Sequence, residues 1–271
     1  MVSDLGALVA WLVVRRMSII AVATTLAWAG VASAAGGGEV VTTLTPNTAS
    51  AASTASVSIT GLSGFSGLPS SIELLLPPGF TSSALSVPEL CTASQASSSS
   101  CPSASQIGTA SAGVSLLGFP LTGMLTVFLG EPLSAGDIAS VILSGSLNGT
   151  RLSLSGRLFV PPQGGLELLI TGFPSVAVTL DSLDLTAKAM QTTTRTVTVT
   201  VIKIKTVTTG KGKHKHKHKK KVRKKVKKTI TTERSLFTNP PTCTGAWAGA
   251  VTLSYSSGSD SLPFSVSCTA T

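Results

Sequence analysis

Short runs of apolar and β-branched residues, interleaved with Ser and Thr, follow one another through most of the chain, and Gly, Pro and Ser separate the runs. Alternation with a period of two predicts half-buried strands, and beyond the N-terminal segment no 3.6-residue periodicity indicates a helix. Many short strands at this spacing are typical of a β-sandwich, so we predict an all-β fold of that kind. The predicted strands cover residues 40–45, 55–60, 71–76, 106–117, 121–129, 138–147, 151–160, 166–171, 175–183, 250–256 and 263–268.

The clearest local signal is a hairpin centred on Asn148-Gly149. These two residues supply the positive φ angles that a type I′ turn needs, and they lie between two of the predicted strands. In the second of those strands, Leu152, Leu154 and Leu158 share one face, while serines and arginines take the other. This pattern predicts a strand with one face in a core and the other in water.

One segment in the second half of the chain departs from this pattern. Thr and Val alternate over residues 196–201, but the alternation slips by one residue at Val201-Ile202, which predicts a β-bulge. A very basic run follows, and residues 229–237 then resume the strand pattern. We therefore predict a projecting two-stranded arm whose tip, residues 203–228, is disordered because like charges this dense repel one another.

The first 34 residues have the features of an export signal. Two arginines precede an apolar run, and Ala32-Ser33-Ala34 provides small residues for cleavage. The alternative is one long membrane anchor over residues 5–35, which the two arginines interrupt. No later segment approaches the 18 or so apolar residues that a membrane-spanning helix needs. The predicted layout is a signal peptide (1–34), a β-sandwich body (35–190 together with 235–271) and an inserted arm (191–234).

Four cysteines, an even set in an exported chain, favour disulfides over metal ligation or nucleophilic chemistry. Three pairings are possible. Local pairing, Cys91 with Cys101 and Cys243 with Cys268, is preferred because each pair brackets one short unit of the chain. Closing loops of this size stabilises a fold by roughly 3 kcal/mol each in the chain-entropy account. We therefore expect a secreted or cell-envelope protein in an extracytoplasmic location.

The charge of the chain is concentrated in one place. The net charge is +10, but 14 of the 21 Lys and Arg lie in residues 203–228, and the rest of the chain sums to −4. This run predicts electrostatic adhesion to anionic cell-envelope polymers or lipid headgroups, at about 1 kcal/mol for each cation near such a surface. The alternative is a solvated low-complexity spacer with no ligand. The predicted polyanion-binding residues are Lys211, Lys213, Lys215, Lys217, Lys219, Lys220, Lys221, Arg223, Lys224, Lys225, Lys227 and Lys228.

The composition of the basic run also limits its partners. The run contains no aromatic residue, so base stacking is absent, which argues against specific recognition of nucleic acid. His214, His216 and His218 alternate with Lys and would share a face of an extended strand, the arrangement that a Zn²⁺ or Cu²⁺ site needs. The neighbouring ammonium groups repel a divalent cation, so we predict neither a metal site nor a cofactor.

Catalytic chemistry finds little support in the residues. Because every His lies in the basic run, the body cannot supply a Ser-His-Asp triad. A Ser-Lys dyad would depend on Lys188, and Asp181 and Asp184, three residues apart on a strand, are expected to point to opposite faces. A carbohydrate site would need aromatic platforms, for which Trp247 and Tyr255 are the candidates. We predict a non-catalytic binding or structural protein, with a carbohydrate-binding module as the alternative and an atypical Ser/Lys hydrolase third.

Several fragments suggest a family. They are Cys101-Pro102 with Gln106-Ile107-Gly108-Thr109, then Pro120-Leu121-Thr122-Gly123, then Asn239-Pro240-Pro241-Thr242-Cys243-Thr244-Gly245-Ala246-Trp247, and the closing Ser265-Val266-Ser267-Cys268. Together they resemble a paralogue-rich group of secreted actinobacterial proteins for which no activity is established. The resemblance spans residues 76–271 and implies secretion and a β-rich body, and it assigns no functional residues. The long basic insertion is a departure from the pattern of that group.

Overall fold

The computed structural model of the chain describes residues 30–33, 38–62, 67–147, 149–174, 178–209 and 216–270. Strands dominate it, so the all-β prediction is confirmed. The strands are β1 (Gly30–Ser33), β2 (Glu39–Thr45), β3 (Thr54–Thr60), β4 (Ser71–Leu76), β5 (Thr81–Ser82), β6 (Gln106–Leu116), β7 (Phe119–Gly130), β8 (Asp137–Leu147), β9 (Thr150–Phe159), β10 (Leu166–Thr171), β11 (Val178–Ala187), β12 (Met190–Thr209), β13 (His216–Ser235), β14 (Phe237–Thr238), β15 (Ala246–Tyr255) and β16 (Gly258–Ser267). The helical elements described in full are α1 (Ala93–Ser97) and the 3-10 turns η2 (Ala84–Ser86) and η3 (Ser103–Ser105).

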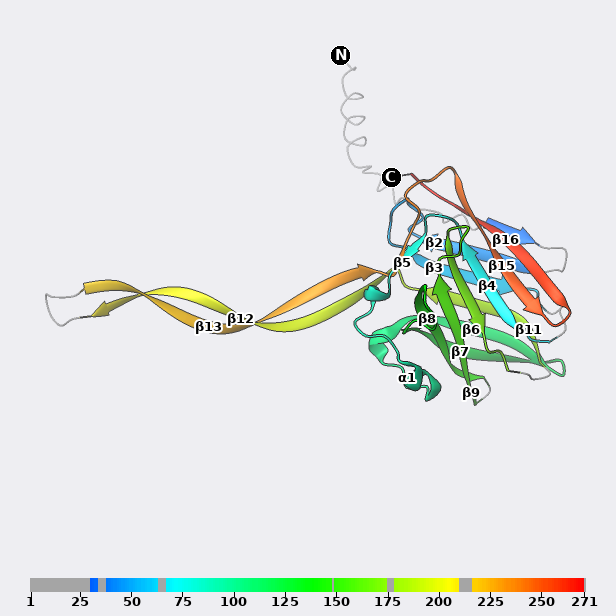
Figure 1. Cartoon of the computed structure of the whole chain (residues 1–271), viewed down its shortest axis with the longest axis horizontal. Helices are drawn as coiled ribbons and strands as arrows, with labels where there is room; N and C mark the ends of the chain where they lie inside the picture. The colour runs from blue at the N-terminus through cyan, green and yellow to red at the C-terminus, as the bar shows by residue number, and fades with distance from the viewer. Residues whose placement is uncertain are drawn as a thin grey trace, which may run out of the picture.

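One large antiparallel sheet makes up the body of the protein. It has 12 strands in the order β1-β2-β3-β11-β6-β7-β8-β9-β10-β4-β15-β16. The strands at the two ends of this order lie side by side, because β16 contacts both β1 and β2. The sheet therefore nearly closes on itself (Figure 1). We predicted a sandwich of two separate sheets, whereas here a single curved sheet forms both facing layers. β5 pairs with β14, and β12 with β13, in separate two-stranded sheets.

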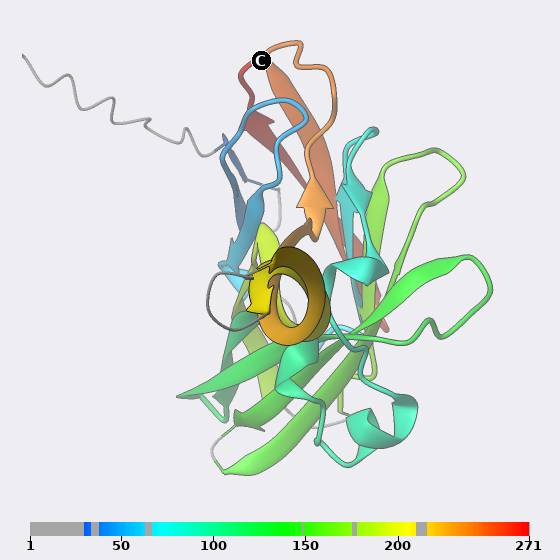
Figure 2. The same cartoon turned by 90° about the vertical axis from the view of Figure 1, so that its left-hand side faces the viewer.

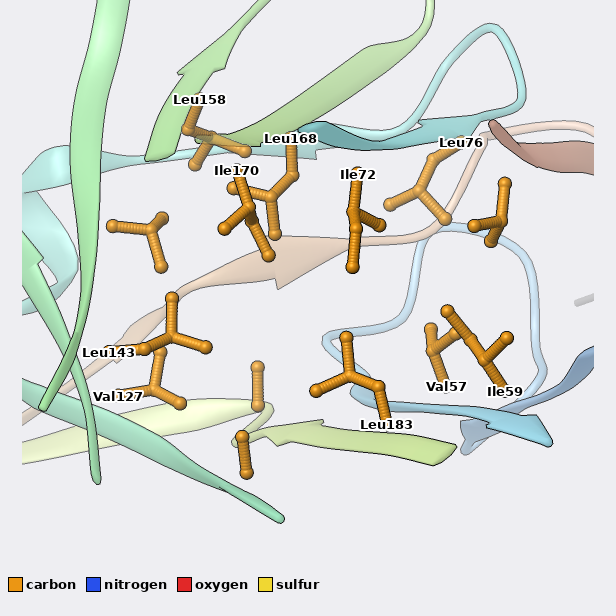
Figure 3. Packing of buried hydrophobic residues seen from close by; sticks show 14 of the residues in the cluster. Val57, Ile59, Ile72, Leu76, Val127, Leu143, Leu158, Leu168, Ile170 and Leu183 are labelled. Atoms are coloured by element: carbon orange, nitrogen blue, oxygen red, sulfur yellow. The ribbon is translucent and has the colours of Figure 1, made fainter. Parts of the chain in front are cut away.

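The core fills the space between the facing sides of the curved sheet. Figure 3 shows side chains of β4 and β10, such as Ile72 and Ile170, pointing toward those of β3 and β11, such as Val57 and Leu183. Alternation along each strand sets this arrangement, because every second residue points inward. Each fully buried Leu, Ile or Val stabilises the fold by roughly 1.5–3 kcal/mol. The buried members of the core come from the body, and no side chain of β12 or β13 that the structure describes is among them.

The predicted hairpin is formed by β8 and β9. Leu147 pairs with Thr150, which leaves a loop of two residues, and Gly149 in that loop has a φ of 80°. Asn148, the other turn residue, lies outside the described residues. Leu154 and Leu158 are buried as the alternation predicts. The turn chemistry and the leucine pattern therefore identified this element correctly.

Both disulfides have the predicted local pairing. Cys91 is bonded to Cys101 and Cys243 to Cys268, at sequence separations of 10 and 25 residues. The first bond brackets α1, which hydrophobic periodicity did not predict because this five-residue helix buries no side chain. A capping box at Thr92 stabilises the start of the helix, with N3 occupied by glutamine. Two disulfides in one chain indicate an oxidising, extracytoplasmic setting.

The predicted signal peptide lies almost wholly outside the described residues. Of the first 34 residues, Gly30–Ser33 are described, as β1, and they pair with β2 with Ser33 opposite Glu39. The predicted cleavage site follows Ala34, so cleavage there would remove β1. Strand β2 would then meet β16 directly at the seam of the sheet, where the two strands already touch.

Candidate functional site

The basic run belongs to the separate sheet formed by β12 and β13, which extends away from the body (Figure 1). Each strand has 20 residues, and they pair without interruption, beginning with Met190 opposite Ser235. The bulge predicted at Val201-Ile202 is therefore wrong. Neither face of this ribbon is buried, so nothing requires the apolar residues to stay on one face, and Ile202 takes the face opposite to that of Val201.

Strand conformation extends through most of the segment that we expected to be disordered. Residues 203–209 belong to β12 and residues 216–228 to β13, while residues 210–215 lie outside the described residues. The amino-acid types account for the difference, because Thr and Val fill most of β12, and Val222 and Val226 interrupt the cations of β13. Such β-branched residues favour extended backbone even where neighbouring charges repel.

The strand register sorts the cationic side chains onto two faces, because residues that pair across an antiparallel ribbon share a face. One face, which we call the cation-row face, carries every odd-numbered residue of β13 from 219 to 227. These cations are Lys219, Lys221, Arg223, Lys225 and Lys227. Their partners on β12 are Thr206, Ile204, Ile202, Thr200 and Thr198. All ten side chains are exposed.

The opposite face, which we call the valine face, mixes charge with apolar side chains. Its described lysines are Lys203, Lys205, Lys220, Lys224 and Lys228, and its valines are Val197, Val199, Val201, Val207, Val222 and Val226. Lys205 lies directly opposite Lys220, a like-charge pair that destabilises the ribbon. Of the basic-run cations whose side chains are described, the two faces therefore carry five each, in different arrangements.

The ribbon has no core of its own. Ile202 is 56% exposed and Ile204 is 62% exposed, so even the largest apolar side chains of the ribbon face water. Figure 2, viewed along the arm, shows the coiled ribbon end-on, with a narrow outline in front of the body. A two-stranded hairpin without a covered apolar face is at best marginally stable in water. The ribbon therefore gains stability from its anchoring to the body and from anionic groups that neutralise the positive charge of its lysines and arginines.

Residues at the base of the arm fasten it to the body. Arg234 donates a hydrogen bond of 2.7 Å from Nη1 to the backbone carbonyl of Leu85, and Gln191 donates one of 3.0 Å to that of Gln106. Leu236, just after β13, is buried in the body core. An open groove of about 660 Å³ lies between η2 and the arm. It is lined by Leu85, Val87, Pro88, Arg195, Val197, Ile230, Thr232 and Arg234.

Two functional candidates in that groove escaped the sequence analysis. Arg195 and Arg234 lie outside the basic run, so the charge count did not single them out. The strand register brings them to one face, since Arg195 pairs with Ile230 and Arg234 with Gln191, both on the valine face. Their shared face follows from the strand register, since the partner of Arg234 lies four residues from Arg195 on β12, and the sequence alone does not give this register.

Several predicted site residues cannot be placed. Lys211, Lys213, Lys215 and His214 lie outside the described residues, as do the side chains of His216, Lys217 and His218. Within the part of the chain that the structure describes, no three His, Cys, Asp or Glu side chains are grouped so as to hold a metal ion.

The residues considered for sugar binding or catalysis lie apart from one another. Trp247 is 5% exposed, packs edge to face against Phe80 with ring centroids 5.7 Å apart, and donates a hydrogen bond of 2.9 Å to the carbonyl of Thr242. Tyr255 is half-buried, and its burial, followed by the charge of Asp260, raises the pKa of its hydroxyl. The side chain of Lys188 is exposed in the connection between β11 and β12.

Asp181 and Asp184 point to the same face, so the prediction that they point to opposite faces is wrong. A register shift between Leu180 and Ser182 inserts an extra residue and reverses the alternation. Asp181 accepts a hydrogen bond from Ser115, and Asp184 accepts one of 3.1 Å from Ser111. Those two serines are four residues apart on β6, roughly 13 Å along the strand. The carboxylates are thus held by separate serines and do not form a close pair.

A charged cluster spans β8, β9 and β10. Arg157 donates hydrogen bonds to both carboxylate oxygens of Asp137, the shortest being 2.7 Å, and this bonding holds the pKa of Asp137 below its ordinary value. Glu167 is only 7% exposed. Burial, followed by the neighbouring charge of Glu73, raises the pKa of its carboxyl. The pKa values of the two carboxyls are therefore shifted in opposite directions.

The cavities inside the curved sheet are small and apolar. Two of them have volumes of about 40 Å³ and 80 Å³, and aliphatic side chains from both sides of the sheet form most of their walls. No titratable residue lines either one. Their walls therefore provide no acid or base.

No protein-family model, no curated protein sequence and no solved structure matches the chain. The resemblance to secreted actinobacterial proteins therefore stays a prediction from the quoted fragments. Among the residues that the structure describes, no helix combines the length and the apolar character needed to cross a membrane.

Proposed function

We propose that the protein is a non-catalytic, secreted or cell-envelope protein that adheres to polyanionic surfaces through its basic arm. The observation that carries this proposal is that 11 of the 14 cationic residues of the basic run lie on the described strands of a ribbon outside the core, while the rest of the chain beyond the run sums to −4. The curved, sandwich-like sheet serves as the scaffold that holds the arm. Anionic envelope polymers and lipid headgroups are the partners that this charge distribution favours.

The size of the effect follows from the geometry of one face. Five exposed cations, each contributing about 1 kcal/mol near an anionic surface, give roughly 5 kcal/mol for one engaged face. That free energy corresponds to a dissociation constant below about 1 mM. Because exposed charges are screened over about 8 Å at physiological ionic strength, adhesion of this kind weakens steeply as salt rises.

The other two candidate functions receive less support. A carbohydrate-binding module needs an exposed aromatic platform, whereas Trp247 is packed against Phe80 and bonded to Thr242. An atypical hydrolase needs a lysine of lowered pKa in a covered pocket beside a serine, whereas the side chain of Lys188 is exposed.

Fractionation of cells with a salt wash tests the proposal. The intact chain should remain with the cell envelope at low salt and be released by roughly 0.5–1 M NaCl, because the Debye length then falls toward 3 Å. A chain from which the arm has been removed should appear in the medium at every salt concentration. Equal retention of both chains would show that the arm does not mediate adhesion.

A further inference from the structure

The two faces of the arm differ in a way that suggests the shape of the ligand. Of the basic-run cations whose side chains are described, each face carries five, but those of the cation-row face occupy every second residue of a single strand. Those of the valine face are divided between β12 and β13, with valines between them. A requirement for charge alone would not distinguish these two arrangements.

The cation row has a regular repeat. Alternate residues of a strand are about 6.8 Å apart, so Lys219 to Lys227 form a single file about 27 Å long. No charged residue lies opposite the file, because its partners on β12 are threonines and isoleucines. A ligand with its own charges in single file can neutralise each cation of the row in turn.

The partners on β12 complete a repeating polar site. Thr198, Thr200 and Thr206 lie opposite Lys227, Lys225 and Lys219. Residues opposite each other in such a ribbon have Cβ atoms about 4.5–5.5 Å apart. A hydroxyl and an ammonium group can therefore both donate to one anionic oxygen centre. Ile202 and Ile204, exposed at the middle of the row, offer apolar contacts to the carbon atoms between such centres.

We propose that the cation-row face binds one flexible, linear phosphodiester chain laid along β13, with about one phosphate for each cation. This inference rests on the proposed function and specifies its ligand. A phosphodiester chain carries one charge per repeat, and an unstacked chain can extend beyond the ~3.4 Å per charge that stacking imposes in a duplex. The ribbon is twisted (Figure 1), so the row winds around it, and a flexible chain can follow the row where a flat surface or a rigid duplex meets only part of it.

Phosphates rather than bases are the recognised groups. Neither β12 nor β13 contains a Phe, Tyr or Trp, so the ribbon lacks the large aromatic rings on which bases most often stack. Phosphate contacts fix the position of a chain without reading its sequence. An abasic chain should therefore bind as well as one with bases.

The test compares two variants of the exported chain that lose the same charge from opposite faces. Lys219→Gln/Arg223→Gln/Lys227→Gln interrupts the row, and Lys220→Gln/Lys224→Gln/Lys228→Gln removes three cations from the valine face. All six side chains are exposed, so both variants should keep the circular dichroism spectrum of the parent. The probe is a fluorescent abasic phosphodiester oligomer of about ten units, which exceeds the five cations of the row.

The row variant should bind the oligomer about 100-fold more weakly than the parent, and the valine-face variant only a few-fold more weakly. The same oligomer with bases should bind within about two-fold of the abasic one. Equal losses in the two variants, or equal competition by a polyglutamate of the same charge, would overturn the assignment of a phosphodiester to the row. Failure of the parent to bind either the oligomer or anionic vesicles would instead refute the adhesive function itself.

Discussion

Excision of the arm between two residues that pair across β12 and β13 should leave the body folded. Thr196 and Thr229 are cross-strand partners near the base of the ribbon. Replacing residues 197–228 by Asn-Gly should close the remaining hairpin with a two-residue type I′ turn. The excision removes all 14 cations of the basic run and retains the anchoring hydrogen bond from Arg234 to Leu85.

The expected change in stability is small. None of the excised residues whose side chains are described belongs to the buried core, and these side chains are exposed or half-buried. We therefore expect the free energy of unfolding to change by less than about 1 kcal/mol, which shifts Tm by about 2–4 °C in a domain of this size. Removing the self-repulsion of the basic run acts in the stabilising direction.

Scanning calorimetry of both chains with intact disulfides measures the shift. A matched excision in the body provides the control, in which Asn-Gly replaces residues 145–152 between the paired Ser144 and Ser153. That change removes Leu147 and Leu152, which pack against the core. Losing both leucines costs about 4 kcal/mol or more, so Tm should fall by about 8 °C or more. A fall of this size on excision of the arm would refute the conclusion that the arm is separate from the core.

Four further predictions concern the body. Trp247→Ala should cost about 3–5 kcal/mol of stability in denaturant unfolding, and sugars should leave the fluorescence of Trp247 unchanged; saturable quenching by a sugar would contradict its packed role. Asp137→Asn should lower Tm at pH 7 but not in acid. The pKa of Asp137 is lower in the folded chain than in the unfolded one, so the ionised carboxylate stabilises the fold above its ordinary pKa. That stabilisation is lost as pH falls through the folded pKa. Glu167→Gln should raise Tm at pH 7. The pKa of Glu167 is higher in the folded chain than in the unfolded one, so ionising this buried carboxyl destabilises the fold increasingly as pH rises past its ordinary pKa. Profiles of Tm against pH that match the parent's would contradict both pKa assignments. Replacing Cys243 and Cys268 together by Ser should cost roughly 3 kcal/mol, and an unchanged unfolding midpoint would show that the bond contributes nothing.

Local patterns predicted the body well because its strands obey them. Residues 71–76, Ser-Ile-Glu-Leu-Leu-Leu between Ser and Pro, form β4 with the predicted bounds, and the Asn-Gly turn correctly joined β8 to β9. The local disulfide pairing followed from sequence separation alone. In these cases burial, turn chemistry and chain length all favour the same structure.

Prediction failed where tertiary contacts or strand register decide the outcome. The bulge beside Asp181 depends on how β11 meets β6, which alternation in β11 alone does not reveal. The slip at Val201-Ile202 suggested a bulge, but on a ribbon without a buried face the pattern places no constraint on register. The closing of the sheet through β16 involves strands from opposite ends of the chain. The cation row depends on the pairing of β12 with β13. Counting charges along the sequence therefore located the arm but could not show how its cations are distributed between the two faces.

The dependence of binding on salt tests the central claim most directly. Binding of the intact chain to an abasic phosphodiester oligomer should be measured by anisotropy between 50 and 300 mM NaCl. Release of counterions from a single-stranded chain gives a slope of about −0.7 per contact in a plot of log K against log salt concentration, so five row cations predict about −3.5. The chain in which Asn-Gly replaces residues 197–228 should show no measurable binding. A slope near zero for the intact chain, or the same slope for the excised chain, would contradict electrostatic adhesion through the arm.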